Sequence, residues 1–123
     1  MNLFVYGTLM DRARIESLLE HPLGDPHGAV MPGFTTVTFE WTYPVMIPDD
    51  GASVEGIVWC GLTDHDLIAL DRYEGCAVPV PVYQREKRKI TIDDREEEVW
   101  AYFGTPAYTA QIRRRKETEN EQR

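Results

Sequence analysis

The start of the chain is the sequence feature that most narrows the possible folds. Residues 2–6 form a short apolar run of strand-forming residues that stops at Gly7. Residues 11–21 then place their apolar side chains at helical spacing, until Pro22 ends the pattern. A strand that turns into a helix in this way leaves unpaired backbone N–H groups, which can hold an anion or a carbonyl oxygen. Many strands end at glycine for reasons of backbone geometry alone, so residues 7–9 become a candidate site only with a chemical partner elsewhere.

Length and composition predict one folded domain. The chain has 123 residues, of which 42% are hydrophobic, and that is enough for a core. We place the domain at residues 1–106 and expect residues 107–123 to be a polar tail, helical or disordered. No apolar run approaches the ~18 residues of a membrane span, and no secretory signal pattern is present. Cys60 and Cys76 are too few for a disulfide framework, so we expect a cytoplasmic protein.

The charge distribution argues against a nucleic-acid partner. The net charge is -8, and the last 13 residues carry more basic than acidic side chains, so the body of the chain is more acidic still. An acidic body repels a phosphate backbone, and we expect neither nucleic acid nor a membrane as partner. The basic run at residues 113–116 is interpreted as a solvated chain end.

The order of elements predicts an α+β domain. Asp49-Asp50-Gly51 is predicted to be a turn, Gly56 a bulge, and residues 93–96 the connection of a hairpin. With two main helices among about six strands, the centre is expected to be a mixed or barrel-like β-sheet. The predicted strands are residues 2–6, pieces within 29–47 broken at Pro32, Gly33 and Pro44, and residues 53–62, 82–92 and 97–103.

The second helix is predicted from its two ends. The Thr63 hydroxyl is placed to accept a hydrogen bond from the N–H of Asp66, and Asp64 and Asp66 suit the first helical turn. Gly75 is a plausible left-handed terminator after Glu74. Asp71 is expected on the solvated side of this helix.

Glu74 is the candidate with the clearest chemical meaning. Leu67, Leu70 and Glu74 share one helical face, so a carboxylate lies at the edge of the buried side. Burial and the negative end of the helix dipole both raise the pKa of Glu74 toward the range of a general base near neutral pH. In the alternative interpretation, Glu74 turns out to water or pairs with Arg72 or Arg85.

The remaining candidates predict no metal and no nucleotide cofactor. The histidines lack metal-ligand spacing, no histidine near Cys76 indicates an activated thiol, and glycine-rich or phosphate-binding lysine motifs are missing. Glu96-Glu97-Glu98 is interpreted as a solvated hairpin turn. Trp41, Tyr43 and Trp59 are expected to lie mostly in the core, although one of them could wall a pocket.

Together these motifs resemble the gamma-glutamylcyclotransferase-like family, of the gamma-glutamylamine cyclotransferase type. The resemblance covers roughly residues 2–103 and is carried by Tyr6-Gly7-Thr8-Leu9, Leu70-Asp71-Arg72-Tyr73-Glu74-Gly75, Tyr83-Gln84-Arg85 and Tyr43-Pro44. In that family a Y-G-[ST]-L loop binds the substrate, and the glutamate of an L-D-x-[FY]-E-G segment is the acid/base. The resemblance implies the family fold, Glu74 as catalytic residue and Tyr6, Gly7, Thr8, Leu9 and Tyr83 as substrate-binding residues.

The resemblance also implies a reaction. A gamma-glutamyl amide would be cleaved by its own α-amino group, in a lyase-like cyclotransfer that gives 5-oxoproline and a free amine. The partner is then a small gamma-glutamyl substrate, and no metal or cofactor is implied. Residues 76–82 form a loop beside the site that is unusually long and apolar. This loop could shape the pocket for the amine. A second hypothesis is a non-catalytic binding or interaction module on the same fold.

Overall fold

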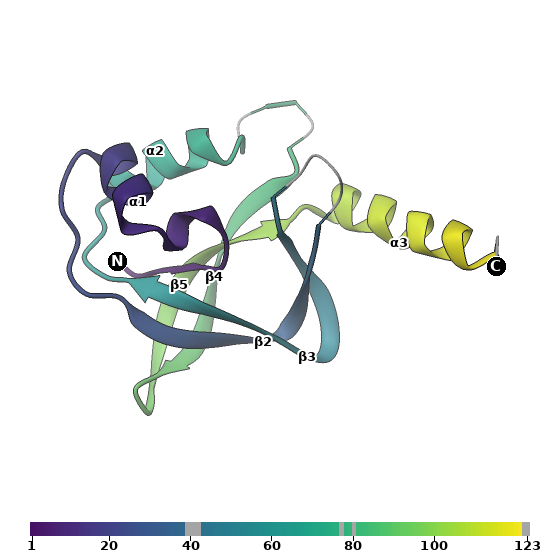
Figure 1. The fold of residues 1–123 in the computed structure, drawn as a ribbon, viewed down its shortest axis with the longest axis horizontal. Coiled ribbons are helices and arrows are strands. Elements are labelled where there is room, and N and C mark those ends of the chain that lie inside the picture. Colours follow the sequence, from purple (N-terminus) through teal and green to yellow (C-terminus); the bar gives the residue numbers. More distant parts are fainter. Residues whose placement is uncertain (39–42, 77, 80, 122–123) are drawn as a thin grey trace.

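The computed structural model describes residues 1–38, 43–76, 78–79 and 81–121. Within this part of the chain, five strands form one mixed sheet in the order β2-β3-β1-β5-β4, with three α-helices around it (Figure 1). The elements in chain order are β1 (Leu3–Val5), the 3₁₀ helix η1 (Thr8–Met10), α1 (Arg12–Leu19), β2 (His27–Val37), β3 (Val45–Trp59), α2 (Asp64–Tyr73), β4 (Tyr83–Ile92), β5 (Arg95–Gly104) and α3 (Pro106–Glu121).

The short strand β1 is the centre of the sheet. It pairs antiparallel with β3 and parallel with β5, and all three of its residues are buried. Because side chains alternate along a strand, Leu3 and Val5 pack into the cluster that includes α1 and α2, whereas Phe4 packs into the cluster on the other side. A strand that is buried on both faces has a continuous run of apolar residues, and such a run was the basis for predicting a strand here.

The sheet curls until its two edge strands meet. β2 and β4 are the outermost strands, yet they contact each other directly. The ring of Phe34 in β2 lies 4.8 Å from that of Phe103 in β5, and the Arg88 guanidinium of β4 lies over both rings. The prediction of an α+β domain with a mixed, barrel-like sheet is therefore confirmed.

Two clusters of buried side chains make up most of the core. The first joins α1 and α2, which lie side by side in Figure 1, to the sheet; the second fills the curled sheet itself. The first comprises Leu3, Val5, Leu9, Ile15, Leu19, Trp59, Leu62, Leu67, Leu70 and Tyr102. The second comprises Phe4, Met31, Met46, Val54, Val58, Ile90, Ile92, Val99, Ala101 and Phe103.

The ends of α2 agree with their prediction. The Asp66 N–H donates to the Thr63 hydroxyl at 3.2 Å, and the Thr63 N–H donates back to the Asp66 carboxylate at 3.0 Å. Gly75 has φ +72°, the left-handed conformation that terminates helices. Asp66 lies in the first helical turn as predicted, and only 2% of this residue is exposed.

β4 and β5 form the predicted hairpin, but its connection is shorter than expected. Ile92 pairs with Arg95, which leaves Asp93 and Asp94, both at positive φ, as the two-residue turn. Glu96, Glu97 and Glu98 lie in β5 and not in a turn.

Two predictions about β3 are wrong. Residues 49–51 do not reverse the chain: the pairing passes from Pro32 with Ser53 to Phe34 with Pro48, so this segment bulges within one long strand. Bulges bend a sheet, which suits its curl. Gly56 pairs regularly with Ala29 and forms no bulge. Packing requires glycine at position 56, because a Cβ there would collide with the Val5 carbonyl oxygen and the ring of Phe4.

The C-terminal segment forms a helix. In α3, Thr109 and Ile112 are buried, and Ile112 packs on Val45 and Ile47 of β3.

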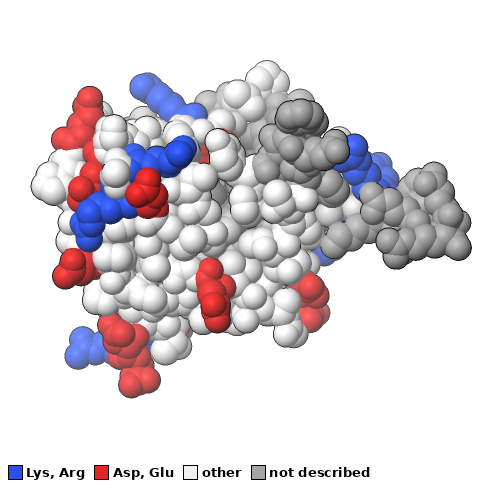
Figure 2. Space-filling model, in the orientation of Figure 1, with Lys and Arg blue, Asp and Glu red and all other residues white. Residues whose placement is uncertain are grey.

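The structure thus has three α-helices and five strands in its described residues, instead of two main helices and about six strands. No helix there is long and apolar enough to cross a membrane. In Figure 2 charges of both signs gather at the end that holds α1 and α2.

Candidate active site

A cavity of about 280 Å³ lies where the end of β1, the end of α2 and the start of β4 meet. It thus joins segments that are far apart in the sequence. Its volume suits a small molecule. The lining residues are Phe4, Val5, Tyr6, Gly7, Thr8, Leu9, Arg14, Tyr43, Pro44, Tyr73, Glu74, Tyr83 and Tyr102. All six residues that the sequence singled out as catalytic or substrate-binding are therefore brought together at one cavity.

Glu74 lines this cavity from the C-terminal cap of α2. Its N–H donates to the carbonyl of Leu70, and Leu67 and Leu70 on the same face are buried, which confirms the predicted spacing. Burial raises the pKa of Glu74 to about 7. No described residue forms an ion pair or a side-chain hydrogen bond with this carboxylate. A half-buried carboxyl group with such a pKa can exchange protons at neutral pH.

The alternative in which Arg85 neutralises Glu74 is not what the structure shows. Arg85 donates from Nε and Nη2 to the two carboxylate oxygens of Asp71, at 2.8 and 3.0 Å, and stacks on Trp100. The Tyr102 hydroxyl donates to the same carboxylate at 2.7 Å. Asp71 is therefore engaged in a network that ties α2 to β4 and β5, and the prediction of a solvated Asp71 is wrong. Burial opposes its ionisation, but the bonds from Arg85 and Tyr102 outweigh burial and lower the pKa of Asp71.

The turn after β1 presents unpaired backbone donors. The carbonyls of Gly7 and Thr8 accept hydrogen bonds from the N–H groups of Met10 and Asp11. The N–H groups of Gly7, Thr8 and Leu9 donate to no other group in the described part of the chain. A Cβ built on Gly7 would meet no atom within 4 Å, so its missing side chain leaves open space beside these donors. A turn of this kind can bind a negatively charged oxygen.

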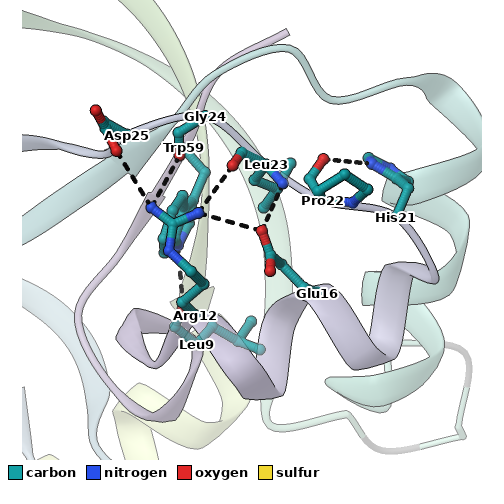
Figure 3. Close-up of polar contacts among 9 residues, drawn as sticks. All are labelled: Leu9, Arg12, Glu16, His21, Pro22, Leu23, Gly24, Asp25 and Trp59. Carbon is teal, nitrogen blue, oxygen red and sulfur yellow. Dashed lines mark hydrogen bonds and ion pairs between the residues drawn. The ribbon is translucent and has the colours of Figure 1, made fainter.

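A tryptophan holds this turn from behind. The buried Trp59 donates from Nε1 to the Leu9 carbonyl at 3.0 Å. The Arg12 guanidinium lies 5.1 Å from the centre of the Trp59 ring and also donates to the carbonyls of Leu23 and Gly24, as Figure 3 shows. Residues 22–25 are thereby held beside Trp59, and the bond to Leu9 ties the turn to a buried side chain.

Tyr6 and Tyr83 form walls whose hydroxyl groups are already bonded. The Tyr6 hydroxyl donates to the Tyr102 carbonyl at 2.8 Å and accepts from the Met46 N–H, and the Tyr83 hydroxyl donates to the Pro44 carbonyl at 3.0 Å. Burial raises the pKa of both tyrosines. Both groups therefore stay neutral, and their protons are committed to backbone carbonyls.

Three lining residues were missed or misplaced by the sequence reasoning. Tyr43 is 60% exposed and belongs to the cavity, not to the core. Tyr73 and Arg14 also line the cavity. Tyr73 was named only as part of the Leu70–Gly75 motif, and Arg14 was not named as a site residue. A signal for Arg14 was available, since a cation in the first turn of a helix is opposed by the helix dipole. Trp59 is buried as expected, whereas Phe39, Trp41, Ala77 and Val80 lie outside the described residues.

No group of three or more potential metal ligands occurs among the residues that the structure describes. The residues that line the cavity supply one carboxyl group, backbone N–H donors and one guanidinium, beside several aromatic rings. This set can move protons and bind negatively charged oxygens.

Known proteins resemble this chain in sequence and in fold. The family model described as gamma-glutamyl cyclotransferase, AIG2-like matches residues 3–121. AIG2-like protein D from Arabidopsis thaliana is 31% identical over 113 residues, which cover 85% of this chain and 70% of that protein.

Solved structures share the fold. A solution structure of an Arabidopsis thaliana protein matches with a TM-score of 0.71 and 26% identity, covering 98% of this chain and 86% of the other. A structure described as a gamma-glutamyl cyclotransferase matches with a TM-score of 0.68 and 18% identity, covering 85% of this chain and 66% of that one. The second likeness concerns the fold alone.

Proposed function

Because the chain belongs to the gamma-glutamyl cyclotransferase, AIG2-like family, we propose that it releases 5-oxoproline and a free amine from a gamma-glutamyl amide. The family includes gamma-glutamyl cyclotransferases, and the fold of this chain is of that type. One observation carries the proposal: Glu74, whose carboxyl group has no partner in the described part of the chain, and residues 7–9, whose N–H groups have none there, line the same cavity.

Glu74 is the proposed general acid/base. The nucleophile is the α-amino group of the substrate, which must lose a proton before it attacks the gamma-carbonyl carbon. The Glu74 carboxylate takes that proton, a new C–N bond closes the five-membered ring, and the amide C–N bond breaks. Glu74 then returns a proton to the departing amine. A carboxyl group with a pKa of about 7 suits both transfers.

The turn at residues 7–9 is the proposed substrate-binding element. Its N–H groups suit the carboxylate of the glutamyl group and also the oxyanion that forms on the gamma-carbonyl oxygen during ring closure. Tyr6 and Tyr83 would bound the cavity and exclude water from the reacting atoms.

The substitution Glu74→Gln tests this role. The amide has nearly the same shape but cannot accept the proton, so 5-oxoproline release should fall by ~10² or more. The fold should survive, and above pH 7 the variant should be at least as stable as the parent, because no charge is then buried at this position. A matched control is Glu55→Gln, on the exposed side of β3, which should leave the rate unchanged.

The readout is 5-oxoproline released from a panel of gamma-glutamyl amides. Unchanged release by Glu74→Gln would eliminate the proposed mechanism. Binding of the amides, seen as thermal shifts, without any product from the parent protein would favour the binding module instead. Release of glutamate in place of 5-oxoproline would indicate hydrolysis.

A further inference from the structure

Arg14 is a charged group at the cavity that the proposed chemistry does not use. It is exposed, and among the described lining residues it is the one with a positive charge. No described Asp or Glu forms an ion pair with it, although the protein is acidic overall. Asp11 attracts Arg14 electrostatically but forms no ion pair with it, so the exposed guanidinium is available to a ligand.

The position of Arg14 links it to the rest of the site. Its Nη1 lies 3.4 Å from the Tyr73 hydroxyl oxygen, which in turn lies 3.3 Å from the Thr8 hydroxyl oxygen. These three side chains thus form a chain from the surface to the turn at residues 7–9. A guanidinium has five N–H donors in a planar fork. Tyr73 is the one hydrogen-bond partner of Arg14 among the described residues, so two of the remaining donors can bind a carboxylate.

Helix stability does not account for Arg14. It lies in the first turn of α1, where the helix dipole disfavours a cation. Asp11 precedes this turn as the N-cap, and no residue within the turn itself is acidic. Arg12, in the same turn, is engaged with Glu16 and the loop at residues 22–25. Arg14 has no such structural partners, and the N-terminal end of α1 adds to its attraction for an anion.

We propose that Arg14 is a specificity-determining residue that binds a carboxylate on the amine portion of the substrate. The inference rests on the proposed function. Because the α-amino group and the gamma-carbonyl must both reach Glu74, the glutamyl group occupies the half-buried end of the cavity. The amine portion then extends to the opening, where Arg14, Tyr43 and Tyr73 are exposed. Amines that carry a carboxylate should be preferred over neutral or cationic ones.

Two substrates that differ only in this carboxylate provide the test. Gamma-glutamylalanine and gamma-glutamylethylamine are identical except that the second lacks the carboxylate of the amine portion. Their dissociation constants are measured with Glu74→Gln, so that no turnover interferes, with and without Arg14→Gln. The matched control is Arg72→Gln, which removes an equal charge from an exposed arginine of α2 that does not line the cavity.

Binding of gamma-glutamylalanine should be favoured by about fivefold or more, and Arg14→Gln should abolish that preference while leaving gamma-glutamylethylamine affected by less than about twofold. Arg14→Lys should restore part of the preference for gamma-glutamylalanine, and added salt should reduce that preference in the parent site. Equal binding of the two compounds, no detectable binding of either, or an equal loss for both in Arg14→Gln would overturn the proposal. Release of 5-oxoproline by the parent is scored separately, so a preference without product would refute the proposed function and leave the role of Arg14 intact.

Discussion

Arg85 is engaged by the carboxylate of Asp71 and not by that of Glu74. Arg85 is bound by Asp71 through two hydrogen bonds, and Tyr102 donates a third bond to the same carboxylate. A buried carboxyl group without a counter-ion is unfavourable in its charged form, and such groups are concentrated at functional sites. The Asp71 network therefore both fastens α2 to the sheet and leaves Glu74 with its raised pKa.

Trp59 is predicted to position the turn at residues 7–9. Trp59→Phe keeps an aromatic ring but leaves the Leu9 carbonyl without its donor, at a cost of about 1–3 kcal/mol in the free energy of unfolding. We expect kcat/KM for 5-oxoproline release to fall about tenfold at a temperature where the variant is folded. Trp100→Phe is the control, since Trp100 packs against Arg85 and does not line the cavity. Equal kcat/KM values for the two variants would mean that Trp59 has only a structural role.

At the level of single residues, the sequence predicted which side of a helix is buried better than which side chains bond to each other. The spacing of Leu67, Leu70 and Glu74 was enough to place a carboxylate at the core edge, because helical geometry is regular. The bond between Asp71 and Arg85 spans two elements and depends on how α2 lies on the sheet, which no local pattern specifies. Arg14 was missed although a cation in the first turn of a helix is a local signal, because that signal does not reveal that α1 borders the cavity.

The two helices beside the site are joined by a charged pair. His21, just after α1, bonds through Nε2 to the Asp66 carboxylate of α2 at 2.8 Å. Its hydrogen bond to the Pro22 carbonyl, followed by the bond to Asp66, raises the pKa of His21. Burial opposes ionisation of Asp66, but bonds from Thr63 and His21 outweigh it and lower the pKa of this carboxyl group.

This pair predicts a pH-dependent contribution to stability. A raised histidine pKa stabilises the fold below about pH 6.5, the ordinary histidine pKa, and the contribution is lost as pH rises through the folded value. A lowered aspartate pKa stabilises above about pH 4, and that contribution is lost as pH falls. His21→Gln should therefore lower the melting temperature more at pH 5.5 than at pH 8.5. His65→Gln, exposed on the same helix as Asp66, is the control and should show no such difference. An equal loss at both pH values for His21→Gln would contradict the role of the pair.

At the level of elements, local signals worked where the local backbone decides the outcome. The cap at Thr63, the terminator Gly75 and the hairpin near Asp93 all follow from short-range hydrogen bonds or positive φ. Asp49-Asp50-Gly51 has the same turn composition, but pairing with β2 keeps this segment in a strand as a bulge. Tertiary pairing overrode the local preference there.

At the scale of the whole molecule, the curled sheet assembles the cavity. The parallel pairing of β1 with β5 and the contact between β2 and β4 bring Tyr6, Tyr83 and the end of α2 together. β1 and β5 are separated by most of the chain length, and β2 and β4 are also far apart in sequence, so periodicity alone could not predict these contacts. The resemblance to a family supplied what the local patterns lacked, since it implied that residues 6–9, 74 and 83 share one site.

The central claim is that Glu74 is the proton acceptor at this cavity, and the pH dependence of kcat/KM for 5-oxoproline release tests it most directly. The carboxylate form is the base, so kcat/KM should rise with pH and level off above a midpoint near 7, where burial has raised the pKa of Glu74. Glu74→Gln should remove this rise together with most of the rate. A rise centred near pH 4.5, or the same midpoint in Glu74→Gln, would contradict the assignment.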